Sequence, residues 1–326
     1  YKNAIPILKK LSTYKDSEKW QYKLGYCYMK MRDFKRADST LMMIMNAPSI
    51  DYYLLYGELK QTTGKYDEAI TLYEKYKMEG GQDSIIDSRI NSCEYANELQ
   101  DSALWHIQVN PNFLNGIYTG GCFHNNLMWF SYKSSMAEDA EHTVPHNIFT
   151  SNADNFFTEY ISNDHLLKSK YYIGGIALSK TTNEIIYSQQ DSEVDKTNDK
   201  RLDKHQISTE YLNTLNLYYG IFDGAIISAV QPFPFNSREY SCMHPSISES
   251  GNICYFSSDM PGGFGGFDIY LIEKINETWS APVNLGPQIN TLGDEMYPYE
   301  YLNSILFFSS NALPGYGGAD IFKCNV

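Results

Sequence analysis

The sequence is poor in the features that mark several common protein classes. No apolar run in the 326 residues approaches the roughly 18 needed to span a bilayer, so no transmembrane helix is predicted. Basic side chains are scarce: 26 Lys and Arg stand against 39 Asp and Glu, which leaves a net charge of −13. This balance excludes a broad basic surface for nucleic acids or anionic membranes.

Motifs for catalysis and for metal binding are also missing. The chain has no HExxH motif, no GxSxG elbow and no GK[ST] sequence after a glycine-rich loop. His142 and His146 are four residues apart, but Pro145 disfavours the helix that would place them on one face. The sequence therefore predicts no zinc site, no nucleotide-binding loop and no cofactor.

The cysteines occur without a CxxC pair or zinc-type spacing. They are scattered through repeated sequence, where a small apolar side chain fits. We expect free, buried thiols at Cys27, Cys93, Cys122, Cys242, Cys254 and Cys324. The cysteine content therefore does not fix the redox compartment.

What the chain does contain is a repeat near its C-terminus. Phe256-Ser257-Ser258 is matched by Phe308-Ser309-Ser310, and Asp268-Ile269-Tyr270 by Asp320-Ile321-Phe322, each 52 residues later. A fixed period of this size indicates a repeat architecture. Strand-forming runs flank a glycine-rich hairpin in each unit, which is typical of β-propeller blades.

Four core strands carry one signature, at 129–131, 186–188, 255–257 and 307–309. We therefore expect an all-β propeller with at least four blades over residues 105–326. The polar run DSEVDKTNDKRLDKH after Gln190 lengthens the second unit, and we interpret it as a long hairpin loop.

A further match predicts how the ring closes. Trp105-x3-Val109-Asn110 resembles Trp279-x3-Val283-Asn284, which is the expected outer strand of the third blade. Residues 105–110 are therefore expected to pair with the strand at 319–323. Such pairing would remove a sheet edge that otherwise invites aggregation.

Residues 1–104 follow a different period. Gly25 and Gly57 are 32 residues apart, and so are Ala37 and Ala69. Small residues at such intervals let paired helices pack closely, while aromatic side chains fill the space between pairs. The pattern resembles tetratricopeptide repeats and predicts an N-terminal α-solenoid, with an incomplete repeat at 1–11, full repeats at 17–48 and 51–79, and a last helix at 83–100.

We interpret the glycine-rich hairpins as turns. Their glycines are expected to adopt positive φ, and the aspartate that follows is expected to bind the turn's amides. These structural residues are Gly262, Gly263, Gly265, Gly266, Asp268, Gly317, Gly318 and Asp320. Asp259, Asp268 and Asp320 could ligate Ca²⁺, but no compact loop supplies the roughly six to eight oxygens required, so no metal site is predicted.

A binding surface is predicted on the helical repeats instead. The first helix of each repeat would turn side chains toward a concave groove of the kind that holds peptides or partner helices. The candidate residues are Tyr22, Tyr26, Met29, Leu54, Glu58 and Gln61. The alternative is that this face packs against the propeller or a further repeat.

The blade sequence YFSSDMPGGFGGFDIY at 255–270 resembles the WD40-like propeller repeat of TolB-like proteins of the Pro-Asp type. Together with the tetratricopeptide-like helices, it is similar to the PorE-type, OmpA-family lipoproteins of the type IX secretion system, although no OmpA-like segment is present. The resemblance implies a periplasmic protein at the outer membrane, with a lipid anchor on a removed N-terminus. It implies other envelope proteins as partners, and peptidoglycan only through an additional domain.

Two functions remain open at this point. The first is a non-catalytic interaction scaffold of the bacterial cell envelope. The second is a propeller enzyme or lectin acting on envelope polysaccharide, in which Asp294 and Glu295 would be the candidate acids. Those two residues stand beside Asn290-Thr291, where hydrogen bonding explains them better, so we expect no catalytic residue.

Overall fold

The computed structural model describes residues 1–14, 17–81, 85–98, 116–124, 127–134, 147–152, 158–160, 173–179, 181–190, 214–223 and 227–326, with the backbone alone over 116–160. Two compact units result, one formed by Tyr1–Trp105 and Ser310–Asp320, the other by His106–Ser309 and Ile321–Val326. The expected closing strand at 105–110, the polar insertion after Gln190 and the pair His142 and His146 lie outside the described residues.

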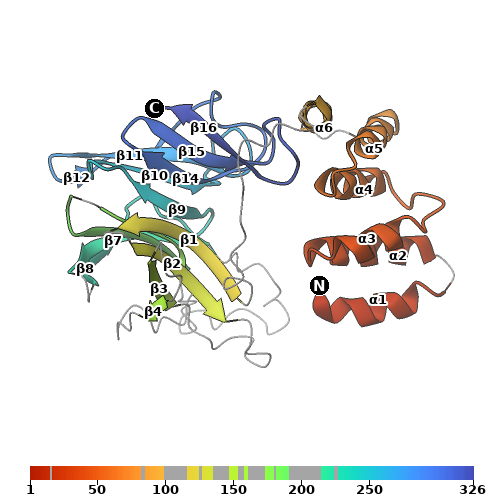
Figure 1. The fold of residues 1–326 in the computed structure, drawn as a ribbon, viewed down its shortest axis with the longest axis horizontal. Coiled ribbons are helices and arrows are strands. Elements are labelled where there is room, and N and C mark those ends of the chain that lie inside the picture. The colour runs from red at the N-terminus through yellow and green to blue at the C-terminus, as the bar shows by residue number, and fades with distance from the viewer. Residues whose placement is uncertain are drawn as a thin grey trace, which may run out of the picture. The chain divides into compact units, whose positions relative to one another are not determined.

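The first unit is built from helices. They are η1 (Lys2–Ala4), α1 (Ile5–Leu11), α2 (Ser17–Lys30), α3 (Phe34–Leu41), α4 (Asp51–Thr62), α5 (Tyr66–Met78) and α6 (Ile86–Glu98). Helix α2 packs on α3, and α4 packs on α5 (Figure 1). These pairs are the two full repeats that the 32-residue period predicts. Among the described residues, no helix is long and apolar enough to cross a membrane.

Two glycines let the paired helices approach each other. A Cβ atom at Gly25 would lie 2.5 Å from Leu41 Cδ2, and one at Gly57 would lie 2.6 Å from the Tyr73 ring. Neither space is available to a larger residue, because both partners are fully buried. The expected role of these glycines, close helix packing within a repeat, is confirmed.

One buried lysine connects the two repeats. Lys60 of α4 is only 4% exposed, and its ammonium lies 2.8 Å from Asp38 of α3 and 2.8 Å from Glu68 of α5. It also lies over the Tyr56 ring, 4.7 Å from the centroid. Burial by itself lowers the pKa of Lys60, but the hydrogen bonds that its ammonium donates to Asp38, Glu68 and Tyr56 outweigh burial and raise that pKa. The positive charge of the Lys60 ammonium is therefore balanced by the carboxylates of Asp38 and Glu68.

The second unit is built from consecutive antiparallel sheets. Blade one contains β1 (Gly116–His124), β2 (Leu127–Ser134), β3 (Asn147–Asn152) and β4 (Thr158–Tyr160). Blade two contains β5 (Ile173–Leu178), β6 (Glu184–Gln190), β7 (Leu215–Phe222) and β8 (Ile227–Pro232). Within each blade, strands that are consecutive in sequence are neighbours in the sheet.

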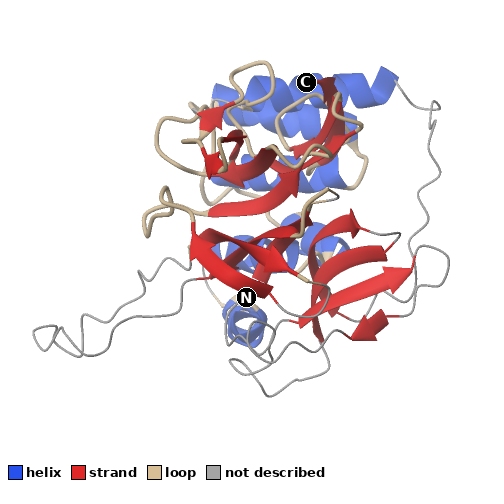
Figure 2. Ribbon diagram, turned by 90° about the vertical axis from the view of Figure 1, so that its left-hand side faces the viewer, coloured by secondary structure: helices blue, strands red, loops and turns tan. Residues whose placement is uncertain are grey.

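Blades three and four repeat this order. Blade three contains β9 (Cys242–Ile247), β10 (Ile253–Ser258), β11 (Asp268–Ile275), β12 (Thr278–Trp279) and β13 (Val283–Asn284), and both short outer strands pair with β11. Blade four contains β14 (Glu295–Tyr301), β15 (Ile305–Ser310) and β16 (Asp320–Asn325). The first strands of successive blades contact one another, β1 with β5, β5 with β9 and β9 with β14. Figure 2 shows the strands of this unit as several twisted sheets. The expected fold class, an α-solenoid followed by an all-β propeller, is confirmed.

The four signature strands take equivalent places. Each is the second strand of its blade, in β2, β6, β10 and β15. In three blades an aromatic ring of this strand pairs with one of the third strand: Tyr187 with Tyr218 at 5.7 Å, Phe256 with Tyr270 at 5.9 Å, and Phe308 with Phe322 at 6.0 Å. The same pair of rings recurs in these three blades and explains why aromatic residues repeat at these positions of the sequence.

Blades two and three share a continuous apolar core. Ile186 and Leu217 of blade two meet Cys254, Phe256 and Tyr270 of blade three. Tyr187 of blade two belongs to a separate cluster on the opposite face, with Ile173 and Ile176. Both faces of the second blade are therefore covered by other side chains. Among the described side chains, Cys27, Cys93, Cys242 and Cys254 are buried free thiols as expected, and Cys324 is half-buried.

Candidate functional site

The predicted binding face begins on α2. Tyr22, Tyr26 and Met29 lie on the same side of this helix, half-buried against the core of the first repeat. The ring of Tyr1 packs edge-on against Tyr26 at 5.8 Å, and the ammonium of Lys30 lies 5.3 Å from the Tyr26 centroid. The result is a row of partly exposed aromatic and thioether side chains, the types that anchor protein interfaces.

The acidic side of this row comes from α4. Burial raises the pKa of the Tyr22 hydroxyl first, and the charges of Asp51, Tyr26 and Glu58 raise it further. Glu58 itself accepts a hydrogen bond from Arg89 of α6, with Nη1 and Oε1 2.5 Å apart. The surface around Tyr22 is therefore apolar with an acidic border.

The far end of the predicted face differs from the expectation. Gln61 is buried, and its Oε1 accepts a 2.8 Å hydrogen bond from the Tyr73 hydroxyl. Leu54 is half-buried against the cluster around Tyr73. The partly exposed residues of the predicted face are thus limited to Tyr22, Tyr26, Met29, Leu54 and Glu58.

Segment Ser310–Asp320 belongs to the same compact unit and explains this limit. The hydroxyl of Ser88 in α6 donates a hydrogen bond to the carbonyl of Ala312. A Cβ atom at Gly317 would lie 2.7 Å from Gln61 Cγ. The chain's own residues therefore cover the face at Gln61, while Tyr22, Tyr26 and Met29 of α2 stay partly exposed. No feature of the helical sequence signals this contact, because it joins residues more than 200 positions apart.

The aspartates of the hairpin loops bind backbone amides. Asp268 accepts hydrogen bonds from the amides of Phe264 (2.6 Å) and Gly265 (3.3 Å), and from Asn284 Nδ2 at 2.8 Å. In the next blade, Asp320 accepts one from the amide of Gly317 at 3.1 Å. Both carboxylates are thus used within their own turns. Among the described residues, no group of three His, Cys, Asp or Glu could hold a metal ion.

The expectation that all glycines of these loops adopt positive φ is partly wrong. Gly262, Gly317 and Gly318 have φ values of 93°, 103° and 73°, as a positive-φ turn requires, but Gly263, Gly265 and Gly266 do not adopt positive φ. Gly265 is needed for a different reason: a Cβ atom there would lie 2.5 Å from the carbonyl oxygen of Thr291 and 2.6 Å from the carbonyl carbon of Leu292. The backbone of residues 291–293, which is distant in sequence, therefore leaves no space for a side chain at position 265.

The carboxylate pair is used structurally as well. Glu295 is 0% exposed and accepts hydrogen bonds from the amide (2.6 Å) and hydroxyl (2.7 Å) of Thr291. Asp294 accepts one from the amide of Phe267 at 3.1 Å. These contacts match the structural interpretation of the pair, and they leave neither acid poised over an open site.

The sequence analysis missed one pair of stacked rings. His244 of β9 and Tyr297 of β14 lie with their centroids 3.8 Å apart, and both have positive φ, 54° and 55°. His244 is 8% exposed, and burial lowers its pKa to about 4. The sequence does carry a feature that the two residues share, because His244 and Tyr297 each precede a proline in the first strand of their blades. Blade two carries Gly174-Gly175 at the corresponding bulge, and a Cβ atom at Gly175 would lie 3.1 Å from His244 Cα.

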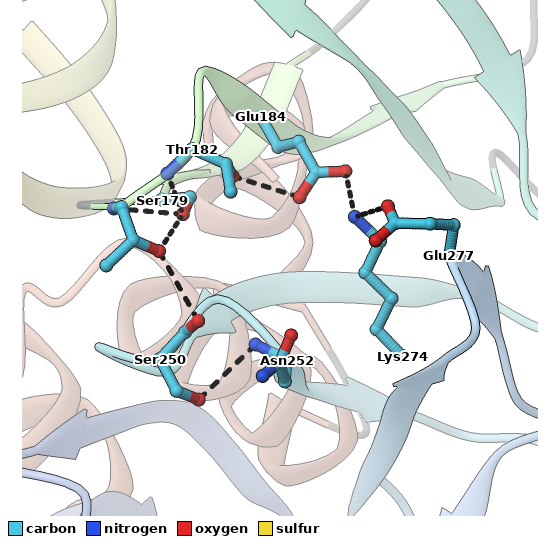
Figure 3. Close-up of polar contacts among 8 residues, drawn as sticks. Ser179, Thr182, Glu184, Ser250, Asn252, Lys274 and Glu277 are labelled. Carbon is cyan, nitrogen blue, oxygen red and sulfur yellow. Dashed lines mark hydrogen bonds and ion pairs between the residues drawn. The ribbon is translucent and has the colours of Figure 1, made fainter.

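A polar cluster joins blades two and three at their outer turns (Figure 3). Lys274 of β11 lies 2.7 Å from Glu184 of β6 and 3.2 Å from Glu277. The hydroxyl of Thr181 donates to the carbonyl of Ser250 at 3.3 Å. The Lys274 and Glu184 side chains are only 12% and 15% exposed, so this ion pair is shielded from solvent.

Comparisons with known proteins agree with this division of the chain. The model of the family described as "Anaphase-promoting complex, cyclosome, subunit 3" matches residues 1–76. No curated protein matches the chain significantly. The first unit is tetratricopeptide-like in its helix pairing, period and glycine positions.

Several solved structures are similar to the chain over more than half of its length. A protein assigned as TolB from Agrobacterium tumefaciens is 11% identical, with 61% of this chain and 62% of that chain covered and a TM-score of 0.36. TolB from Acinetobacter baumannii is 11% identical (64% and 54% covered, TM-score 0.32). A GH43 endo-arabinanase from Bacillus licheniformis is 11% identical (63% and 71% covered, TM-score 0.34). The chain spans less than two thirds of the length of either TolB protein. At such low similarity, any activity has to be argued from this chain's own residues.

Proposed function

We propose that this protein is a non-catalytic interaction scaffold whose α2 row holds a segment of a partner protein. The observation that carries the proposal is the run of Tyr22, Tyr26 and Met29, which stays partly exposed while Gln61 of the predicted face is buried. Tyr is among the residues that dominate the binding energy of protein interfaces, and Met is enriched at them. Asp51 and Glu58 border the row, so a partner segment with apolar anchors and a flanking Lys or Arg fits it best.

The cellular setting is part of the same proposal. The combination of tetratricopeptide-like helices with TolB-like blades resembles envelope proteins, and we propose a periplasmic location at the outer membrane, with other envelope proteins as partners. The type IX secretion system is the specific assembly that this resemblance suggests. Localisation of a tagged chain by cell fractionation tests this part separately from the binding test.

Site-specific photocrosslinking tests the binding face. A photoreactive phenylalanine at position 26 is expected to form discrete adducts in native cells, because Tyr26 lies within the row. The same probe at Tyr95, which is 44% exposed on α6, is the matched control and should give none of these adducts. Identical adducts from both positions, or none from position 26, would contradict the assigned face.

Activity assays test the non-catalytic part of the proposal. We expect no turnover of peptides, esters, glycosides or nucleotides, because both carboxylates of the candidate pair are held by backbone and side-chain donors. The decisive variants are Asp294→Asn and Glu295→Gln. Turnover by the natural chain that either variant abolishes, with folding intact by circular dichroism, would establish the enzyme alternative.

A further inference from the structure

The charges of the helical region are separated along the sequence. Residues 1–104 contain 15 Lys and Arg and 15 Asp and Glu, so this region has no net charge. Ten of the 15 basic residues lie before position 51, together with only four of the acidic ones. The segment up to the end of the first repeat is therefore basic and the rest of the region is acidic. The net charge of −13 hides this basic segment.

The cations of the basic segment find few partners within the protein. Its described carboxylates are engaged already: Asp33 binds Arg36, Asp38 binds Lys60, and Glu18 accepts a hydrogen bond from Asn46. The other cations of α2, of the turn after it and of α3 are exposed and form no ion pair with a described residue; they are Lys19, Lys23, Lys30, Arg32 and Lys35. Helices α1 and α4 both pack on α2, so these cations do not stand at the end of the stack.

Three of these cations form a stripe on α2. Lys19, Lys23 and Lys30 follow one another at intervals of four and seven residues, which places them on one side of the helix. The ammonium groups of Lys19 and Lys23 lie 5.5 and 5.4 Å from the centroid of the Trp20 ring. That of Lys30 lies 5.3 Å from the Tyr26 centroid. Lysines and aromatic rings are therefore interleaved along the stripe.

The turn after α2 adds an apolar side chain at the end of the stripe. Met31 is 43% exposed and stands between Lys30 and Arg32 in the sequence. The turn is fixed, because Arg32 has a φ of 56° and its amide donates a 2.9 Å hydrogen bond to the carbonyl of Met29. An apolar side chain between two cations can enter the headgroup region of a bilayer while the cations contact the headgroups. A soluble polyanion offers no such environment to Met31.

We propose that the first repeat docks on an anionic lipid surface through this stripe and turn, which we name the basic face. It consists of Lys19, Trp20, Lys23, Tyr26, Lys30, Met31 and Arg32. Eight of the ten cations in the basic segment are Lys, a point charge without the fork geometry that favours Arg at bidentate carboxylate sites. Trp and Tyr are typical of the zone between bilayer and water. The acidic residues of positions 51–104 are repelled by the same surface, so docking also orients the solenoid.

Co-sedimentation of the full chain with lipid vesicles tests the proposal. At low ionic strength the natural chain is expected to bind vesicles made of equal parts of phosphatidylglycerol and phosphatidylcholine, and not vesicles of phosphatidylcholine alone. The binding should disappear at about 1 M salt, where the Debye length is only about 3 Å. A natural chain that binds neither kind of vesicle, or both equally, overturns the proposal.

Paired substitutions test whether the basic face is the part that binds. Lys19→Gln combined with Lys23→Gln should weaken binding to the anionic vesicles about tenfold or more, because each Lys near such a surface strengthens binding severalfold. Lys75→Gln combined with Lys77→Gln is the matched control, since it makes the same charge change at exposed residues of α5. The control should change binding less than about twofold, because charges farther than a Debye length of about 8 Å from the lipid are screened. Equal weakening by both pairs would refute the basic face.

Two further measurements separate charge from fold and lipid from other anions. Lys19→Arg combined with Lys23→Arg keeps both charges and should bind as the natural chain does; a loss equal to that of the Gln pair would contradict electrostatic docking. Polyglutamate and duplex DNA are the soluble alternatives. Binding to either one without binding to anionic vesicles would identify an acidic protein or a nucleic acid as the occupant and overturn the proposal. Because pure vesicles contain no protein, this result is independent of the photocrosslinking at position 26.

Discussion

Blades three and four share part of their sequence, yet the isoleucines at one shared position differ in burial. Ile269 of blade three is 0% exposed, whereas Ile321 of blade four, 52 residues later, is 78% exposed. An aromatic pair between the second and third strands occurs in both blades. This difference shows that the burial of a residue in a repeat protein depends on what packs against its repeat, and not on the sequence of that repeat alone.

The largest contrast should appear when the two isoleucines are truncated. Ile269→Ala is expected to lower the free energy of unfolding by about 3–4 kcal/mol, because it removes a buried side chain and leaves a cavity. Ile321→Ala should change it by less than about 0.5 kcal/mol, since most of that side chain already contacts water. Urea unfolding of both variants measures the two losses. Equal losses would mean that Ile321 is as buried as Ile269 in solution.

The bulges of the first strands give a pH-dependent contrast. The pKa of His244 is about 4 when folded, against a usual 6.5, so the folded state holds the ring neutral. Stability is complete above pH 6.5, and it falls as pH drops toward 4, because the unfolded chain binds the proton first; the loss reaches about 3 kcal/mol.

His244→Asn, which tolerates the positive φ, should remove this part of the acid sensitivity. Tyr297→Asn, at the equivalent position of blade four, should retain a slope between pH 4 and 6.5 because His244 is still present, and it should lower the stability at neutral pH because the stacked ring is lost. Urea midpoints measured at each pH separate the slope from that offset. An unchanged slope in His244→Asn would contradict the assignment.

The glycines of the two hairpin loops should respond to different substitutions. Gly265→Ala is expected to cost about 2–3 kcal/mol because its Cβ atom meets backbone atoms of the next connection. Gly318→Ala should cost about 1 kcal/mol, because φ is 73° there although the space around it is open. Asn should recover part of the loss at 318 and none at 265, since Asn tolerates positive φ but is larger than Ala. Thermal melts of the four variants distinguish steric crowding from backbone strain.

The smallest effect concerns the ion pair between blades two and three. Lys274 has Val326 at the same position of blade four, so Lys274→Val makes the two blades alike. We expect a loss of about 1–2 kcal/mol, because Glu184 would stay shielded without its partner. Glu277→Gln is the control and should be neutral, since Glu277 is 92% exposed. A double-mutant cycle of Lys274→Val with Glu184→Gln measures the coupling directly.

Much of the architecture followed from spacing alone. The interval between Gly25 and Gly57 predicted the helix pairs, since only a residue without Cβ fits where those helices cross. The shared signature identified the second strand of each of the four blades, and the 52-residue period related blades three and four, where the ring pair of Phe256 and Tyr270 recurs as Phe308 and Phe322. Asp268 was placed correctly at the turn amides, since that bond is local.

The candidate site was predictable only in part. The row of Tyr22, Tyr26 and Met29 could be found from helical periodicity, because one helix face is defined by local spacing. The burial of Gln61 could not, as it depends on Tyr73 and on segment Ser310–Asp320. The stacking of His244 on Tyr297 likewise joins two blades.

The sequence by itself determined the two repeat periods, the order of helices and strands, and the turns closed by residues a few positions apart. These depend on backbone preferences and on contacts within one repeat. The tertiary structure alone decided why Gly265 has to be glycine, which part of the helical face stays open and which of two equivalent isoleucines meets water. Those outcomes depend on which surfaces from distant parts of the chain pack together, and a repeated local pattern carries no information about that packing.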